Sequence, residues 1–190
     1  MKTQRETPDF VCQKLLGKLP ITDGIKILEP SAGEGKIIQY LLENYSIKNC
    51  DIILHELNKE RISKAQQILD SLNKSHDIFY YQQDFLKTRE ELGSSFPYDV
   101  IVACPPFKNN VDIEHIKLMY DLLRNKGMMA TLTSPYWVTN NEPHQIEFRK
   151  WLEGKDYQLE LLPDDTFIEK GKTVPSAILT IYKRPKNITI

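Results

Sequence analysis

The stretch Ile27-Leu-Glu-Pro-Ser-Ala-Gly-Glu-Gly-Lys36 decides the fold of this chain. It predicts a short apolar strand, an acidic corner, a glycine turn and then a helix over residues 36–44. Gly33 and Gly35 lack a β-carbon, so the chain can turn tightly there and a ligand can approach the backbone. The first amide groups of the helix point at the same place. We therefore expect a ligand site in front of this turn.

The charge of the turn separates three kinds of ligand. A dinucleotide site has the same strand, glycine turn and helix, but the carboxylates of Glu29 and Glu34 would repel a pyrophosphate. A P-loop needs Ser or Thr after its Gly-Lys, whereas Ile37 follows Lys36 here. The acids suit a cation, and S-adenosylmethionine carries both an ammonium and a sulfonium. An ordinary glycine turn in another α/β protein is the alternative.

The segment Leu28-Glu-Pro-Ser-Ala-Gly-Glu-Gly35 resembles motif I of the class I S-adenosylmethionine-dependent methyltransferases. The resemblance implies an α/β, Rossmann-like fold, with a seven-stranded, mostly parallel sheet of order 3-2-1-4-5-7-6 and helices on both faces. It implies one catalytic domain over residues 1–190, with an N-terminal helix segment at 1–24 and no separate target-recognition domain. It also implies that S-adenosyl-L-methionine contacts Glu29, Pro30, Ser31, Ala32, Gly33 and Gly35.

Two further strand ends predict contacts with the same cofactor. A buried strand at 51–55 runs into Glu56-Leu57, where a carboxylate can accept from both hydroxyls of a ribose; a helix N-terminal acid is the other interpretation. A strand at 77–82 is followed by Asp84-Phe85, which can bind an adenine amino group and cover a ring face. The family places such a pair there, although a loop Asp that caps a turn is the alternative.

The N-terminal segment contains Thr7-Pro8 before an apolar pattern that predicts a helix. In methyltransferases whose tenth motif precedes the other motifs in the chain, a similar Thr-Pro lies against the methionine part of the cofactor. The resemblance therefore implies cofactor contacts for Thr7 and Pro8. The alternative is a first helix that only packs on the sheet.

A buried strand at 98–103 leads to the corner Cys104-Pro105-Pro106-Phe107. Two consecutive prolines fix the backbone and remove its donors, so the carbonyl groups are left to accept hydrogen bonds. Phe107 adds a ring face. This combination suits a planar group that carries an amino donor.

The corner resembles the fourth motif of methyltransferases that modify amino nitrogens of adenine, cytosine or glutamine. There Asn, Asp or Ser precedes Pro-Pro-Tyr or Pro-Pro-Phe, and its side chain and the first proline carbonyl accept from the target amine. The two acceptors pull the nitrogen toward a tetrahedral shape and free its lone pair. The resemblance implies catalytic roles for the corner residues, Cys104, Pro105, Pro106 and Phe107, with the Phe107 ring stacked on the base.

Cys104 departs from this motif, because a thiol is a weak acceptor and a weak donor. Three explanations compete. The thiol, or its thiolate beside the sulfonium, supports reduced activity; or the protein binds cofactor and substrate without turnover, inside a heteromer; or Cys104 is a nucleophile that methylates a ring carbon. The third is the weakest, since in the cytosine-carbon enzymes the cysteine follows the proline.

The C-terminal third continues the alternation of helices and strands. A helix at 112–123, stopped by Asn125-Lys-Gly127, precedes a strand at 128–133, and an antiparallel pair at 158–162 and 177–183 ends the chain. Residues placed to bind the target base, by the end of the fifth strand and in the connection 163–175, are Tyr136, Trp137 and Phe167. For Tyr136 and Trp137 the alternative is a pair of aromatics that cover the edge of the sheet. The linker 87–97 is charged and then rich in Gly and Ser, which predicts a short helix followed by a loop.

Composition limits the partners. The chain has 190 residues, 41% hydrophobic and 27% charged, and a net charge of -1. A polynucleotide would therefore be bound by a local patch, a partner subunit or the pocket itself. No run is long enough to span a bilayer and no export signal is present, so we expect a soluble cytoplasmic protein.

The cysteines and histidines predict no metal site. The three cysteines are odd in number and lack a Cys-x-x-Cys pair, which indicates a reducing compartment. The histidines share no ligand spacing, so we interpret them as surface or partner-satisfied residues. These histidines are His55, His76, His115 and His144.

Together these features predict methyl transfer from S-adenosylmethionine to an exocyclic amino nitrogen, favouring adenine N6 in DNA or RNA. The target base would be flipped or single-stranded, because its amino group must reach the sulfonium. The alternatives are a catalytically impaired cofactor-binding subunit of a methyltransferase complex and a protein glutamine N-methyltransferase.

Overall fold

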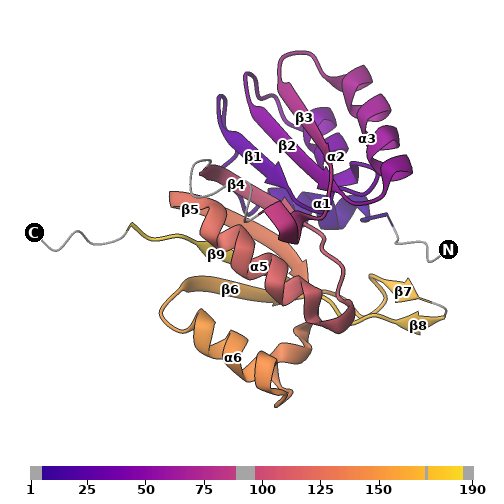
Figure 1. Cartoon of the computed structure of the whole chain (residues 1–190). Coiled ribbons are helices and arrows are strands. Elements are labelled where there is room, and N and C mark those ends of the chain that lie inside the picture. Colours follow the sequence, from indigo (N-terminus) through magenta and orange to yellow (C-terminus); the bar gives the residue numbers. More distant parts are fainter. Residues whose placement is uncertain (1–5, 89–96, 170, 186–190) are drawn as a thin grey trace, which may run out of the picture.

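The computed structural model describes residues 6–88, 97–169 and 171–185. A seven-stranded sheet of order β3-β2-β1-β4-β5-β9-β6 runs through the molecule, and only β9 lies antiparallel to its neighbours (Figure 1). The strands are β1 (Lys26–Glu29), β2 (Asp51–Glu56), β3 (Asp77–Gln82), β4 (Tyr98–Ala103), β5 (Leu123–Thr133), β6 (Asp156–Leu161) and β9 (Ala177–Tyr182). With β9 as the seventh main strand, this is the predicted order, and the fold prediction is confirmed.

Helices cover both faces of the sheet, which makes three layers (Figure 1). One core cluster joins α1, α2 and α3 to the sheet, and the other joins α5 and α6 to the opposite face. The helices are α1 (Asp9–Leu16), α2 (Lys36–Asn44), α3 (Lys59–Leu72), α5 (Val111–Leu122) and α6 (Pro143–Leu152). The apolar strands β1, β2 and β4 are buried because both of their faces are covered.

The path from α5 into β5 differs from the prediction. The helix ends at Leu122 and the strand begins at once at Leu123, so Asn125-Lys126-Gly127 lies inside β5. The register with β4 shifts there, and the Lys126 N–H donates to the Lys183 carbonyl at 2.8 Å. The backbone groups of this irregular stretch are thus satisfied by Lys183, directly after β9 (Ala177–Tyr182) and 57 positions after Lys126, which a local pattern does not reveal.

The C-terminal connection contains a second small sheet. Strands β7 (Ile168–Glu169) and β8 (Lys172–Thr173) form an antiparallel pair within the predicted connection 163–175. Short 3-10 helices η1 (Phe85–Lys87), η2 (Lys108–Asn110) and η3 (Pro135–Val138) follow β3, β4 and β5. Most of the predicted linker 87–97 lies outside the described residues. Among the residues described, no helix is long and apolar enough to cross a membrane.

The turn between β1 and α2 brings α2 against α3. Gly35, at the start of α2, has a φ of 82° in the left-handed region. A β-carbon at this position would lie 3.1 Å from the Ala65 Cβ and 3.2 Å from the Leu69 Cδ1. Gly35 is therefore required both by its backbone conformation and by the close packing of α3.

Replacing Gly35 by alanine should cost more stability than replacing Gly24, which also has a positive φ of 72° but no atom within 4 Å of an added β-carbon. Gly24→Ala should lose about 1 kcal/mol from the left-handed backbone alone. Gly35→Ala should lose about 1–3 kcal/mol more, because the new methyl group overpacks α3. Urea unfolding measures the loss of unfolding free energy in both variants. Equal losses would show that α3 moves to accommodate the new methyl group without a loss of stability.

Candidate functional site

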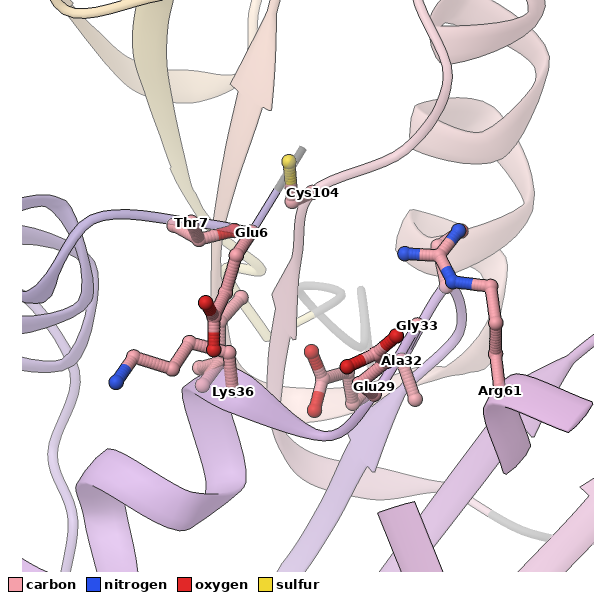
Figure 2. A pocket seen from close by; sticks show the side chains of 11 residues that line it. Glu6, Thr7, Glu29, Ala32, Gly33, Lys36, Arg61 and Cys104 are labelled. Atoms are coloured by element: carbon pink, nitrogen blue, oxygen red, sulfur yellow. The ribbon is translucent and has the colours of Figure 1, made fainter. Parts of the chain in front are cut away.

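A cavity of about 290 Å³ opens at the carboxyl end of β1. Its wall comes from four segments that are far apart in sequence: residues 6–7 before α1, the turn and first residues of α2, Arg61 of α3, and Cys104 after β4 (Figure 2). Six predicted site residues line it, Thr7, Glu29, Ser31, Ala32, Gly33 and Cys104. The structure thus joins the glycine turn, the N-terminal segment and the double-proline corner at one place.

Glu29 is the most unusual group in this cavity. The residue is 1% exposed, and its Oε2 atom has no hydrogen-bond partner among the described residues. Burial raises the pKa of the carboxyl well above its usual value, the nearby Glu56 raises it further, and a hydrogen bond from the Ile38 backbone opposes both. A cation beside Oε2 would stabilise the ionised carboxyl and give the orphaned oxygen a partner.

Glu56 lies at the end of β2 and holds the glycine turn. Its Oε2 accepts from the Gly33 N–H at 2.9 Å, and its Oε1 accepts from the Asn58 N–H at 2.8 Å. The carboxylate therefore ties the turn after β1 to the start of α3. A carboxylate offers about four acceptor positions, so this bonding leaves capacity for ribose hydroxyls.

Asp84 and Phe85 do not line the cavity. The Asp84 Oδ1 atom accepts from the Leu86 N–H at 3.1 Å, so the side chain caps the turn of η1, which was the alternative interpretation. Phe85 is 2% exposed, with its ring 5.8 Å from His55 and 5.2 Å from His115. Leu57 is 66% exposed. The ring of Phe85 is fixed in the core, and the predicted adenine contacts lie outside the cavity lining.

His55 and His115 are buried beside this site. The His55 Nδ1 atom is 3.1 Å from the Gln83 amide nitrogen, and the His115 Nδ1 atom is 3.3 Å from the Ser31 hydroxyl. Burial lowers the pKa of each imidazole to about 4, so both rings are neutral at pH 7. His115 therefore supports the cavity wall through Ser31. No group of three potential metal ligands occurs in the described part of the chain.

The Cys104 thiol lines the cavity together with Thr7, whose side chain opposes part of the effect of burial on the pKa of Cys104. Burial raises the pKa of Cys104 to about 11, so the group is a thiol at neutral pH. Without a bound cation, the structure therefore holds no thiolate acceptor at the first position of the corner. The next residues lie beyond the cavity lining: Pro105 is buried, Pro106 is exposed and Phe107 is half-buried.

The predicted base-binding aromatics have different environments. Trp137 is 4% exposed, donates through Nε1 to the Thr133 hydroxyl at 3.2 Å, and packs edge-on against Phe148 at 5.0 Å. This burial corrects the expectation that Trp137 grips a base. Tyr136 is 52% exposed after β5, and the half-buried Phe167 packs against the same core cluster as Phe107. Pro8, Pro30 and Gly35 adjoin the lining without forming it.

Sequence reasoning missed Arg61, Lys36 and Glu6 as lining residues. Lys36 forms an ion pair with the Asp9 Oδ1 at 2.8 Å, which joins α2 to α1. The guanidinium of Arg61 lies against Gly33, where an added β-carbon would be 2.7 Å from Nη2. A helical pattern places Arg61 in the first turn of α3, but the direction of its side chain depends on tertiary packing.

Comparisons with known proteins identify the fold. Neither a protein-family model nor a curated protein matches the sequence. The type I restriction enzyme EcoKI M protein is similar, with a TM-score of 0.75 and 14% identity over 95% of this chain and 44% of that chain. A protein from Listeria monocytogenes, named provisionally as a class I S-adenosylmethionine-dependent methyltransferase, has a TM-score of 0.71 and 15% identity over 96% of this chain. The chain has the class I methyltransferase fold.

Other proteins with the methyltransferase fold match over their whole length. An rRNA methylase from Streptococcus thermophilus has a TM-score of 0.60 and 13% identity, over 96% of this chain and 99% of that chain. The chain spans only 62% of the Listeria monocytogenes protein. At these identities the comparisons establish the fold alone.

The ends of β1 and β2 fit S-adenosylmethionine, which is named as the cofactor of the similar Listeria monocytogenes protein. Glu29 Oε2 is a buried acceptor that lacks a partner among the described residues and suits an ammonium group. Gly33 has a φ of 58° and presents backbone without a side chain to the cavity. Glu56, at the end of the next strand, lies outside the cavity lining but bonds to Gly33 and has acceptor capacity left. S-adenosylmethionine offers a complementary group to each of these three features.

Glu29→Gln should remove a pH dependence from the stability of the ligand-free protein. The unfolded chain loses the Glu29 proton near pH 4.5, whereas the folded protein retains it to higher pH. The folded state binds more protons in this window, so its stability falls as pH rises, by at most about 1.4 kcal/mol per pH unit. Urea unfolding between pH 5 and 8 measures the slope in both proteins.

Glu153→Gln, at an exposed position after α6, is the matched control and should keep the wild-type slope. Glu29→Gln should also weaken the binding of a cationic ligand, because the amide has no charge to offer a cation. An unchanged slope in Glu29→Gln would mean that another group carries the pH dependence.

Proposed function

We propose that this chain binds S-adenosylmethionine in the cavity and transfers its methyl group to an exocyclic amino nitrogen, with adenine N6 of DNA or RNA as the target. One observation carries the proposal: the buried, orphaned Glu29 carboxyl faces the same cavity as Cys104, the first residue of the double-proline corner. An acid suited to a cation, at the end of β1, and a corner suited to an amine, after the neighbouring β4, thus lie at the same edge of the sheet.

The cofactor would supply an electrophilic methyl group on a sulfonium. Glu29 would bind the ammonium group, the backbone of residues 31–33 would support the methionyl part, and Glu56 would accept from the ribose hydroxyls. Thr7 and Pro8 would close the N-terminal side. Contacts of Leu57, Asp84 and Phe85 with adenine stay a prediction, since these residues lie outside the cavity lining.

The corner residues would act on the target amine. An exocyclic amine is a poor nucleophile, because its lone pair is delocalised into the ring. The Pro105 carbonyl would accept one N–H, the Cys104 sulfur would accept the other weakly, and Phe107 would stack on the base. The bond between nitrogen and the methyl carbon would form as the bond from that carbon to sulfur breaks, so S-adenosylhomocysteine would leave as a neutral thioether. The nitrogen would release one proton to solvent, and the amino group would end as a secondary amine.

The nucleic-acid target draws support from the similar structures. Among them are the EcoKI M protein, of a type I restriction enzyme, and an rRNA methylase. The chain has a net charge of only -1, so a local patch or a partner subunit would supply most of the affinity for a polyanion.

A second function is favoured by the state of Cys104. The side chain is a neutral thiol, because burial raises its pKa to about 11, and a thiol is a weak acceptor. A cofactor-binding subunit that needs a partner for turnover would keep the fold and the cavity while losing this acceptor.

Cys104→Asn should raise methyl transfer about a hundredfold, because an amide oxygen replaces a weak acceptor at the target nitrogen. The measurement is transfer of a tritiated methyl group onto DNA, RNA and cell protein in parallel, followed by nucleoside analysis. Cys104→Ala is the matched control and should not exceed the wild-type rate. We expect N6-methyladenine as the labelled product.

Three results would redirect the proposal. Labelling of protein alone would favour a glutamine amide as the target. Labelling by Cys104→Asn but not by the wild type would favour the cofactor-binding subunit. Cofactor binding by both proteins without any labelling would contradict the enzymatic function and leave only cofactor binding.

A further inference from the structure

Arg61 places a cation inside the cavity at the glycine turn. It enters from the first turn of α3, where its own N–H donates to the Asn58 Oδ1 at 3.0 Å. An added β-carbon on Gly33 would lie 2.7 Å from the Nη2 and 3.3 Å from the Cζ of Arg61. Figure 2 shows the guanidinium turned toward the space in front of Gly33. Nothing in the proposed chemistry so far uses this group.

The charges of the cofactor leave one group without a partner on the protein. The methionyl part of S-adenosylmethionine carries an ammonium, a sulfonium and a carboxylate. The buried Glu29 suits the cations, but it would repel the carboxylate. A carboxylate held in the same cavity therefore needs a protein cation within reach.

Arg61 suits the carboxylate better than Lys36, the other basic residue of the lining. In Figure 2 the Lys36 side chain extends away from Gly33, and its ion pair with the Asp9 Oδ1 at 2.8 Å holds it toward α1. A guanidinium carries five donors in a planar fork, so it can bind a carboxylate through two hydrogen bonds and still serve a protein acceptor. The wall beside the glycine turn is also where the methionyl part would lie.

We propose that Arg61 binds the α-carboxylate of the cofactor, an inference that rests on the proposed function. Arg61 then acts as a specificity determinant. It favours adenosyl ligands that keep the amino-acid carboxylate over those that lack it, such as 5′-methylthioadenosine. Glu29 and Arg61 would bind the two ends of the same amino-acid group, and their opposite charges would fix its orientation.

The test is a comparison of two ligands that differ only in this carboxylate, S-adenosylhomocysteine and its decarboxylated analogue, by isothermal titration calorimetry. The wild type should bind the decarboxylated analogue about 10- to 100-fold more weakly, the range for a charge-assisted hydrogen-bonded pair. Arg61→Gln should reduce this ratio to about threefold or less, and Arg61→Lys should restore part of it. Lys59→Gln, an exposed residue of the same helix, should keep the wild-type ratio.

Each other outcome overturns the inference in a recognisable way. Equal affinity of the wild type for both ligands would remove the carboxylate contact and leave the proposed function intact. Loss of the ratio in Lys36→Gln but not in Arg61→Gln would assign the contact to Lys36. Tighter binding of both ligands by Arg61→Gln would show that Arg61 only fills the ligand-free cavity. If the wild type binds neither ligand, the proposed function fails together with this inference.

Discussion

The hydrogen bond from the Gly33 N–H to Glu56 is the contact on which the site depends. It fixes the turn after β1 to the end of β2, and the other oxygen of the same carboxylate fixes the start of α3. A second bond, from the Ala32 N–H to the His55 carbonyl at 2.9 Å, holds the same two strand ends together. The position of Gly33, the entry of α2 and the approach of Arg61 all follow from this anchor.

The anchor also sets the electrostatics of the cavity. Glu56 stands near the buried Glu29, and both burial and this second acid disfavour ionisation of Glu29. Such a pair costs stability in the ligand-free protein, because one carboxyl cannot find a partner. The same cost becomes binding energy when a cation enters. The cavity thus suits a positively charged ligand, and the unpartnered acid lowers the stability of the ligand-free protein.

The corner after β4 shows that the fold alone does not determine the function, because a single residue of the corner departs from the motif. The double proline provides acceptors and Phe107 a ring, in the arrangement expected for an amine target. Cys104, at the first position, stays a neutral thiol because burial raises its pKa. The fold and the cavity therefore match the proposed function, whereas the strength of the proposed acceptor depends on a single side chain.

The sequence by itself determined the succession of strands and helices, the glycine turn, the acids at the ends of β1 and β2, and through the family resemblance the strand order. Apolar runs, their periodicity and glycines are local patterns, so a short window of sequence is enough to predict the strands, helices and turn. Residues that lie next to each other in the motif, such as Ser31, Ala32 and Gly33, also reached the cavity as expected.

Only the tertiary structure decided which side chains face the cavity. It buried Trp137 against Phe148, fixed Phe85 between two histidines, and carried the stretch after α5 into the sheet through contacts with β9. It also brought Arg61 to Gly33, 28 positions earlier in the chain. The direction of a side chain is set by packing against residues distant in sequence, and no local pattern records those contacts.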